Sequence, residues 1–219
     1  MAQGKGRLNG AFITFEGIDG CGKTTQARLL AAYLREKGHK VLETREPGGT
    51  SIGTALRAIL QDAANRGMTP LSELLLYLAD RVQHLAETIR PALARGETVV
   101  CDRFHDATVA YQHHGRGLDF GPVAPLIERE IAINPPDLTF WLDVSLGTAR
   151  ERLTRRGATG TGPEARIEGE EEAFHERVRG GYAALHRQHP RRIVRVDAAE
   201  PIAALAGRIR RELEERYVV

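Results

Sequence analysis

The segment 11–26 reads AFITFEGIDGCGKTTQ, and its residues 17–24, GIDGCGKT, match the pattern G-x-x-x-x-G-K-T. An apolar run at 11–15 comes directly before this pattern, and a helical pattern follows it. When a strand leads into a glycine-rich turn, successive backbone N–H groups converge at the start of the next helix, where an anion replaces their missing helical partners. The sequence therefore predicts a phosphate-binding loop.

Each residue type in this loop has its own task. The Lys23 ammonium reaches the terminal phosphates of a nucleoside triphosphate, and the Thr24 hydroxyl holds Mg²⁺. Gly17 and Gly22 let the backbone approach the phosphates without an intervening side chain. The alternative is a chance match in an ordinary loop, and the flanking strand and helix argue against it.

Length and composition limit the fold and the partners. A chain of 219 residues can bury one sizeable core. Residues 1–10 are Gly-rich and polar, so we expect a flexible N-terminal tail there and a single domain over 11–219. A net charge of +2 gives no reason to expect nucleic acid or a membrane surface as a partner. Since no stretch resembles a signal sequence or a membrane span, we expect a soluble, cytoplasmic protein.

The chain has two cysteines, Cys21 in the loop and Cys101 at the end of an apolar run. Their positions do not indicate a structural disulfide. Cys21 is also a candidate reactive thiol, because helix N-termini lower thiol pKa values.

The order of elements predicts the fold class. Five apolar runs without alternation predict strands buried on both faces, at 11–15, 41–44, 98–101, 138–142 and 193–196. Helical patterns lie between and after them, at 25–37, 52–64, 70–95, 146–156, 170–189 and 201–217. Such alternation gives an α/β fold of three layers, with a mainly parallel five-stranded sheet between helices and ligands at the carboxyl ends of the strands.

Charged residues gather at these strand ends. TREPGGT (44–50) follows the second strand and brings Arg45 next to the phosphate loop. Asp102 and Arg103 follow the third strand; Arg103 is suited to clamp a phosphate, and Asp102 to orient a Mg²⁺-bound water or to hold an arginine. A plain loop and a surface ion pair are the alternatives.

The helix predicted over 70–95 combines an aromatic ring with polar groups on one face, formed by Tyr77, Asp80, Arg81 and His84. A ring stacks on a base and an arginine donates to a base carbonyl, so this face suits a nucleobase pocket. Thr108 and Gln112 add a hydroxyl and an amide for the base edge. The histidines do not have zinc-ligand spacing with the cysteines, so Mg²⁺ is the one metal expected.

A glycine-rich stretch, 157–163, is bracketed by five arginines: Arg150, Arg152, Arg155, Arg156 and Arg166. The glycines predict a small mobile lid at about 150–168, whose closure would bring arginines onto the phosphates and exclude water. A solvated, Arg-rich helix beside a disordered loop is the alternative.

These residues together resemble the bacterial thymidylate kinases, a family with the P-loop kinase fold that phosphorylates dTMP to dTDP with ATP for dTTP biosynthesis. The resemblance spans nearly the whole chain. It is carried by FEGIDGCGKTTQ (15–26), TREPGGT (44–50), LLLYLADRVQH (74–84), DRF (102–104), AYQ (110–112), GRG (115–117), PDLTFWLD (136–143) and RIE (166–168).

The resemblance implies a role for each candidate. ATP would be bound by Gly17, Ile18, Asp19, Gly20, Cys21, Gly22, Lys23 and Thr24. The dTMP site would comprise Asp19 near the sugar and phosphate, Arg103 on the phosphate and Tyr77 stacked on thymine, with Arg81, Gln112 and Thr108 at its polar edge and Arg45 close by. Thr24 and Asp102 would hold Mg²⁺. The catalytic groups would be Lys23, Asp19, Arg103 and a lid arginine from among Arg155, Arg156 and Arg166.

The chain departs from the family pattern at two positions. Ala165 replaces the Asp that often precedes Arg-Ile-Glu, and Phe104 replaces a Tyr or His. Members of the family tend to dimerise, and the apolar face of 70–95 offers a surface, so a homodimer is expected.

Three alternative functions stay open on the sequence. A kinase for another monophosphate, such as dUMP, shares the loop and the lid. A GTPase-type switch usually carries Asn-Lys-x-Asp, whereas NPPD (134–137) lacks the lysine. A degenerate scaffold without activity is disfavoured by the intact Lys23 and Thr24.

Overall fold

The computed structural model describes residues 6–127, 135–155, 157 and 166–219. Its central sheet is parallel and has the strand order β3-β4-β2-β5-β6. The strands are β2 (Phe12–Glu16), β3 (Val41–Arg45), β4 (Thr98–Asp102), β5 (Leu138–Asp143) and β6 (Ile193–Asp197). All five strands predicted from the apolar runs therefore form, and the predicted parallel sheet is confirmed.

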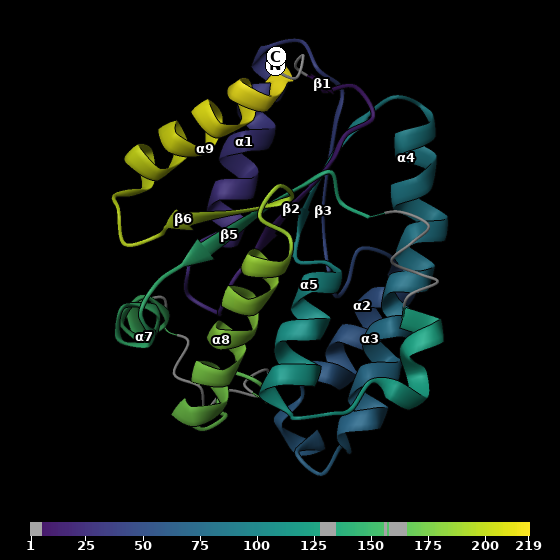
Figure 1. Ribbon diagram of the computed structural model, residues 1–219. Helices are drawn as coiled ribbons and strands as arrows, with labels where there is room; N and C mark the ends of the chain where they lie inside the picture. Colours follow the sequence, from purple (N-terminus) through teal and green to yellow (C-terminus); the bar gives the residue numbers. More distant parts are fainter. Residues whose placement is uncertain (1–5, 128–134, 156, 158–165) are drawn as a thin grey trace.

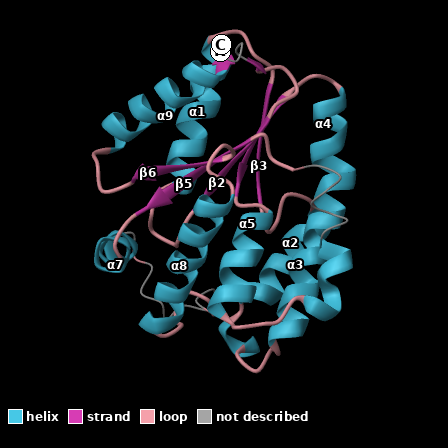
Figure 2. Ribbon diagram, viewed as in Figure 1, coloured by secondary structure: helices cyan, strands magenta, loops and turns pink. Residues whose placement is uncertain are grey.

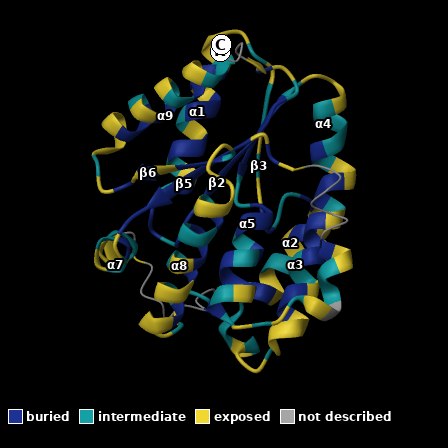
Figure 3. Ribbon diagram, in the orientation of Figure 1, coloured by how far each residue is buried: buried dark blue, intermediate teal, exposed yellow. Residues whose placement is uncertain are grey.

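Helices cover both faces of this sheet (Figures 1 and 2). On one face lie α1 (Lys23–Glu36) and α9 (Ile202–Arg216), and on the other lie α4 (Arg90–Ala94), α5 (His105–Thr108) and α8 (Glu172–Gln188). The β2 and β5 strands are buried along their whole length as a result (Figure 3), which is why their sequences are continuously apolar or uncharged except at their last residue. Beyond the carboxyl ends of the strands lie α2 (Ser51–Gln61), α3 (Pro70–His84) and α7 (Leu146–Arg155).

The helix predicted over 70–95 contains a π turn. It is α3, a π-helical turn at Leu85–Ile89 and α4, in direct succession. Thr69 caps the start by accepting a hydrogen bond from the Ser72 backbone N–H. Pro91 lies just past the π turn, and the wider turn accommodates a ring that would collide with the carbonyl of Glu87 in a regular helix.

Several elements were not predicted. A second π helix, Val109–Gly115, continues α5, and short 3₁₀ turns form at Ala63–Asn65 and Gly121–Val123. A small parallel sheet pairs β1 (Gly6–Arg7) with β7 (Tyr217–Val218). The predicted flexible tail is therefore fixed from Gly6 onward, and Leu8 is buried in the main core.

Two loop glycines set the distance between the phosphate loop and its neighbours. Gly17 has φ 139° and Gly20 has φ 81°. A Cβ on Gly17 would lie 2.5 Å from the Leu142 carbonyl oxygen, and one on Gly20 would lie 2.4 Å from that of Ala149. The loop therefore packs backbone to backbone against β5 and α7, which only glycine permits.

Candidate functional site

The phosphate loop connects β2 to α1, as the sequence predicts. Gly22 has a left-handed backbone (φ 104°) directly before α1 starts at Lys23. The Lys23 ammonium donates to the Ile18 carbonyl oxygen at 2.8 Å, so its charge lies inside the loop. The Thr24 hydroxyl donates to the Asp102 carboxylate at the end of β4. The predicted metal ligands are thus brought together as an oxygen pair.

Arg103 joins the loop to the end of β4. It is the one non-glycine residue with positive φ (72°) in the described part of the chain. Its guanidinium donates to the Asp19 carboxylate at 2.6 Å, to the Gly17 carbonyl at 3.0 Å and to the Tyr111 hydroxyl at 3.0 Å. Burial disfavours a charged Asp19, but Arg103 and Lys23 outweigh this and lower the pKa of the carboxyl.

A buried glutamate, Glu16, holds the backbone directly after Arg103 in place. Glu16 ends β2, accepts from the Phe104 backbone N–H at 2.7 Å and accepts from the Tyr182 hydroxyl at 2.8 Å. Burial, followed by the nearby Asp106 carboxylate, raises the pKa of Glu16 to about 7. Phe104 itself is fully buried, and its ring centroid lies 4.8 Å from that of Phe12 in an edge-on arrangement. The Phe at this position is therefore part of the core.

A cavity extends from Arg103 along α3, and we call it the α3 cavity. It is lined by Asp19, Glu46, Pro47, Arg57, Gln61, Tyr77, Arg81, Arg103, Phe104, Ala107, Thr108, Tyr111, Gln112 and Ile167. Six of the seven residues predicted for the acceptor meet there, and they include the four predicted to contact the base, Tyr77, Arg81, Thr108 and Gln112. Burial raises the pKa of Tyr77 to about 12, so this ring is neutral.

The predicted polar face of α3 has two functions in the structure. Arg81 lines the cavity and is held by Glu46 at 2.9 Å and by the Phe104 carbonyl at 3.1 Å. Asp80 and His84 instead anchor the loop after β3: Asp80 accepts from the Gly48 backbone N–H at 3.0 Å, and His84 contacts Glu46 at 3.0 Å.

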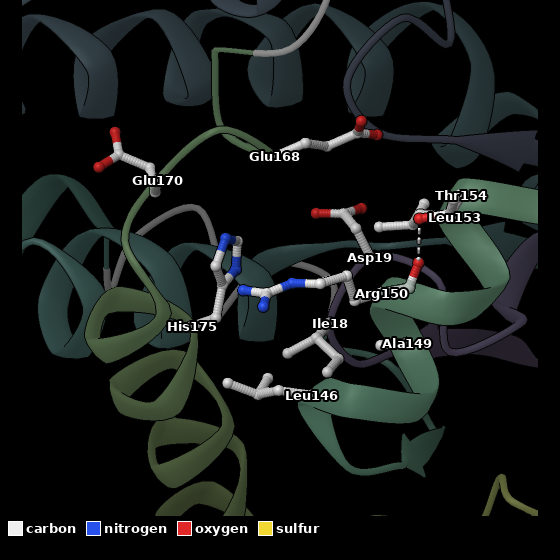
Figure 4. A pocket seen from close by; sticks show the side chains of 10 residues that line it. All are labelled: Ile18, Asp19, Leu146, Ala149, Arg150, Leu153, Thr154, Glu168, Glu170 and His175. Atoms are coloured by element: carbon white, nitrogen blue, oxygen red, sulfur yellow. Dashed lines mark hydrogen bonds between the residues drawn. The ribbon is translucent and has the colours of Figure 1, made fainter. Parts of the chain in front are cut away.

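A second cavity, the α7 cavity, has a volume of about 220 Å³ and lies between the phosphate loop, α7 and the start of α8 (Figure 4). The Arg150 guanidinium extends across it toward His175, and Asp19 and Glu168 are drawn above the Arg150 side chain in this view. Because Asp19 also lines the α3 cavity, the two cavities meet at this carboxylate.

Two further cavities flank α1. Arg45 lines one of them with Thr24 and Asp102, so it lies on the phosphate side and outside the α3 cavity. The other, the α9 cavity, is lined by Cys21, Gly22, Thr25, Gln26, Arg152, Arg155, Ala198, Ala199, Glu200, Pro201, Ile202 and Leu205. Arg152 donates there to the carbonyls of Cys21 at 3.3 Å and Ala198 at 2.8 Å. Nothing in the sequence singles out residues 198–202, because their position depends on the pairing of β5 with β6.

The predicted lid arginines that the structure describes, Arg155 and Arg166, lie in different surroundings. Arg155 is exposed and pairs with Glu151 at 2.6 Å. Arg166 is buried, donates to the Leu60 carbonyl and pairs with Glu73 at 2.6 Å. The structure therefore places Arg166 against α2 and α3 and away from the phosphate loop. Arg156 and Ala165 lie outside the described residues, as does the rest of 158–165 within the predicted lid.

The two cysteines are free and buried, as expected without a disulfide. Burial raises the pKa of the Cys21 thiol in spite of Lys23 and Arg103, which argues against the hypothesis of a reactive thiol at this position.

Comparisons with known proteins agree with this geometry. Residues 15–209 match the family model described as thymidylate kinase. The chain is 52% identical to a thymidylate kinase of Gloeobacter violaceus, covering 91% of this chain and 92% of that protein. It is 49% identical to a thymidylate kinase of Trichlorobacter lovleyi, and this match covers 95% of this chain and 99% of that protein.

A solved structure extends the likeness to the fold. The thymidylate kinase of Ehrlichia chaffeensis superposes with a TM-score of 0.73 at 34% identity, covering 94% of this chain and 99% of that one. The motifs, the cavities and these likenesses point the same way: the chain belongs to the thymidylate kinase family, a group of nucleoside monophosphate kinases.

Proposed function

We propose that this chain transfers the γ-phosphoryl group of ATP to dTMP, giving dTDP and ADP. The observation that carries the proposal is the Arg103–Asp19 pair, which joins the phosphate loop to a cavity with a neutral aromatic ring, an arginine and an amide. A donor and an acceptor bound on either side of this pair bring their phosphates together.

The acceptor lies in the α3 cavity. The Tyr77 ring stacks on the base, and Arg81, Thr108 and Gln112 reach its polar edge. Arg103 holds the acceptor phosphate, and Asp19 fixes Arg103 and faces the sugar. Since this phosphate is already ionised at neutral pH, the reaction needs positioning and charge neutralisation more than a strong base.

The donor lies on the other side of the loop. The loop N–H groups and Lys23 hold the phosphates of ATP, and the α9 cavity beside Arg152 takes the adenosine. Arg155 at the end of α7 and Arg156, the next residue in the sequence, are the candidates for charge on the transferring group. Arg45 faces the phosphates from the opposite side.

The residues present fit Mg²⁺. The Thr24 hydroxyl and the Asp102 carboxylate are adjacent oxygen ligands, the type this ion prefers. Two protein ligands agree with an ion that takes its other ligands from phosphates and water, and among the described residues no cluster of three His, Cys, Asp or Glu side chains competes as a metal site. When bound, the ion neutralises phosphate charge.

We also propose a homodimer that works in the cytoplasm. Apolar side chains are exposed along α2 and α3, namely Ile52, Ile59, Leu71, Leu75 and Val82. Leu71, Leu75 and Val82 recur at helical spacing, so they form one face, and a second copy of the chain would cover it. No helix in the described ranges has the length and apolarity that a bilayer span requires.

An acceptor panel tests the function. ADP release from Mg²⁺–ATP is measured with dTMP, dUMP, dCMP, dGMP and no acceptor. We expect dTMP to be preferred, with dUMP about 10- to 200-fold slower, because one methyl group contributes only about 1–3 kcal/mol of discrimination. ADP release at the same rate with dTMP and without any acceptor would support a nucleotide-driven switch and contradict the proposal.

A further inference from the structure

We propose that Glu73 is a positioning residue that fixes the orientation of the Gln112 amide, and that it thereby selects bases that present a ring N–H beside a carbonyl. The inference rests on the proposed function only in placing the base in the α3 cavity. Glu73 does not line that cavity, and no motif in the sequence marks it.

Glu73 lies one helical turn before Tyr77 on α3 and is buried. One carboxylate oxygen accepts from Gln112 Nε2 at 2.8 Å and from Arg116 Nε at 3.3 Å. The other accepts from Arg116 at 3.0 Å and from Arg166 at 2.6 Å. The carboxylate therefore connects α3 with the π helix that carries Gln112 and with the segment that carries Arg166.

Neighbouring groups keep the Glu73 carboxyl ionised. Burial alone would favour the protonated acid, but hydrogen bonds from Arg116 and Gln112 and the charges of Arg116 and Arg166 outweigh it and lower the pKa. An ionised carboxylate only accepts hydrogen bonds. The amide of Gln112 must then turn its NH₂ group toward Glu73, which leaves the carbonyl oxygen as an acceptor available to a base.

Arg81 supplies the opposite polarity in the same cavity. Its Nε and one terminal nitrogen are engaged by Glu46 and the Phe104 carbonyl, and a guanidinium can only donate. The cavity thus offers an acceptor from Gln112 and a donor from Arg81. Thymine and uracil match this pattern with N3–H and O4. Cytosine presents a bare N3 and an amino group, so both contacts with it would be mismatched.

The test compares Glu73→Gln with the parent enzyme. A glutamine both donates and accepts, so the Gln112 amide is free to turn either way. The readout is the ratio of kcat/KM for dTMP to that for dCMP. We expect a ratio on the order of 10⁴ in the parent, because a site built around a hydrogen bond rejects mismatched ligands strongly, and a fall of at least about tenfold in the variant.

Two further variants distinguish an effect of Glu73 on the orientation of the Gln112 amide from a general effect on stability. Arg116→Gln removes a partner of Glu73 but leaves Arg166 and Gln112 on it; we expect a lower Tm and an unchanged ratio. In a Gln112→Met background, Glu73→Gln should have no further effect on the ratio, because the amide through which Glu73 acts is absent. A folded, active Glu73→Gln enzyme with the parent ratio would overturn the inference.

A measurement on the unsubstituted protein covers the case in which Glu73→Gln does not fold. The side-chain amide protons of Gln112, assigned by their absence in Gln112→Met, should exchange with solvent at least about tenfold more slowly than those of the exposed Gln188. Equal exchange rates would refute the contact with Glu73. If the parent does not phosphorylate dTMP, the proposed function fails, while slow exchange would still uphold the Glu73–Gln112 contact.

Discussion

Arg103 adopts a backbone conformation that costs a non-glycine residue about 1–2 kcal/mol. Glu16 offsets that cost by accepting from the backbone N–H of the next residue, Phe104. The same carboxylate holds the Tyr182 hydroxyl, which contacts Arg103 at 3.3 Å. One buried group therefore fixes both the backbone and the side-chain surroundings of the residue assigned to the acceptor phosphate.

This arrangement makes stability depend on pH. The folded protein raises the pKa of Glu16 from 4.5 to about 7, so it holds this proton more tightly than the unfolded chain does. The free energy of unfolding should therefore fall as the pH rises from about 4.5 to 7, by about 1–3 kcal/mol. Glu16→Gln removes the titration. Urea unfolding of both proteins between pH 5 and 8 should show the parent losing stability relative to the variant, and parallel curves would contradict the assignment.

Lys23 places its positive charge inside the phosphate loop, where the ammonium donates to the Ile18 carbonyl oxygen. We expect Lys23→Ala to lower kcat about 10²- to 10³-fold, because a preorganised cation is lost where negative charge is transferred. Lys37→Ala, a matched change just past the other end of α1, should leave kcat within about twofold. A Lys23→Ala enzyme with full activity would refute the assignment of this residue.

Most of the acceptor residues predicted from the sequence lie together in the structure, whereas one predicted lid arginine lies elsewhere. Asp19, Tyr77, Arg81 and Thr108 were predictable because motifs at strand ends and helical spacing converge on one edge of a parallel sheet. Arg166 was not, since its position depends on Glu73, a partner 93 residues away whose burial no local pattern reveals.

At the scale of elements, α8 and the π helix that carries Gln112 approach each other closely. A Cβ on Gly115 would lie 2.8 Å from the side chains of Phe174 and Val178, and one on Gly181 would lie 2.8 Å from the His114 ring. Glycine on both partners thus allows the close contact between the two helices.

Two adjacent glycines on α8 test this packing. Gly181→Ala should lower the free energy of unfolding by about 1–3 kcal/mol, because the new methyl group overpacks the contact with His114. Gly180→Ala meets nothing within 4 Å and should raise stability by about 0.5–1 kcal/mol through helix propensity. Chemical denaturation measures both, and changes of the same sign would show that the interface adapts.

The strands and most helices follow from apolar periodicity, whereas the two π turns do not. Residues 109–115, VAYQHHG, have no repeat that distinguishes a π helix from a loop. Their conformation depends on α8, which is more than 55 residues further along the chain.

At the scale of the whole molecule, the exposed apolar face of α2 and α3 predicts self-association. Leu71 and Leu75 are 46% and 45% exposed. Leu75→Glu should shift the protein from dimer to monomer in light scattering coupled to gel filtration, because a charge would have to be buried between the copies. Val218→Glu, an exposed position on β7, should not change the mass. A monomeric parent would contradict the proposed dimer.

The close approach of Gly20 to the Ala149 carbonyl has a consequence for how this enzyme tolerates change. At this point the phosphate loop and the helix that presents Arg150, Arg152 and Arg155 meet backbone to backbone, so a shift of one displaces the other. Any side chain introduced at residue 20 would tilt α7 and displace three guanidinium groups together. A substitution at Gly20 would therefore change the positions of arginines that lie more than 125 residues later in the chain.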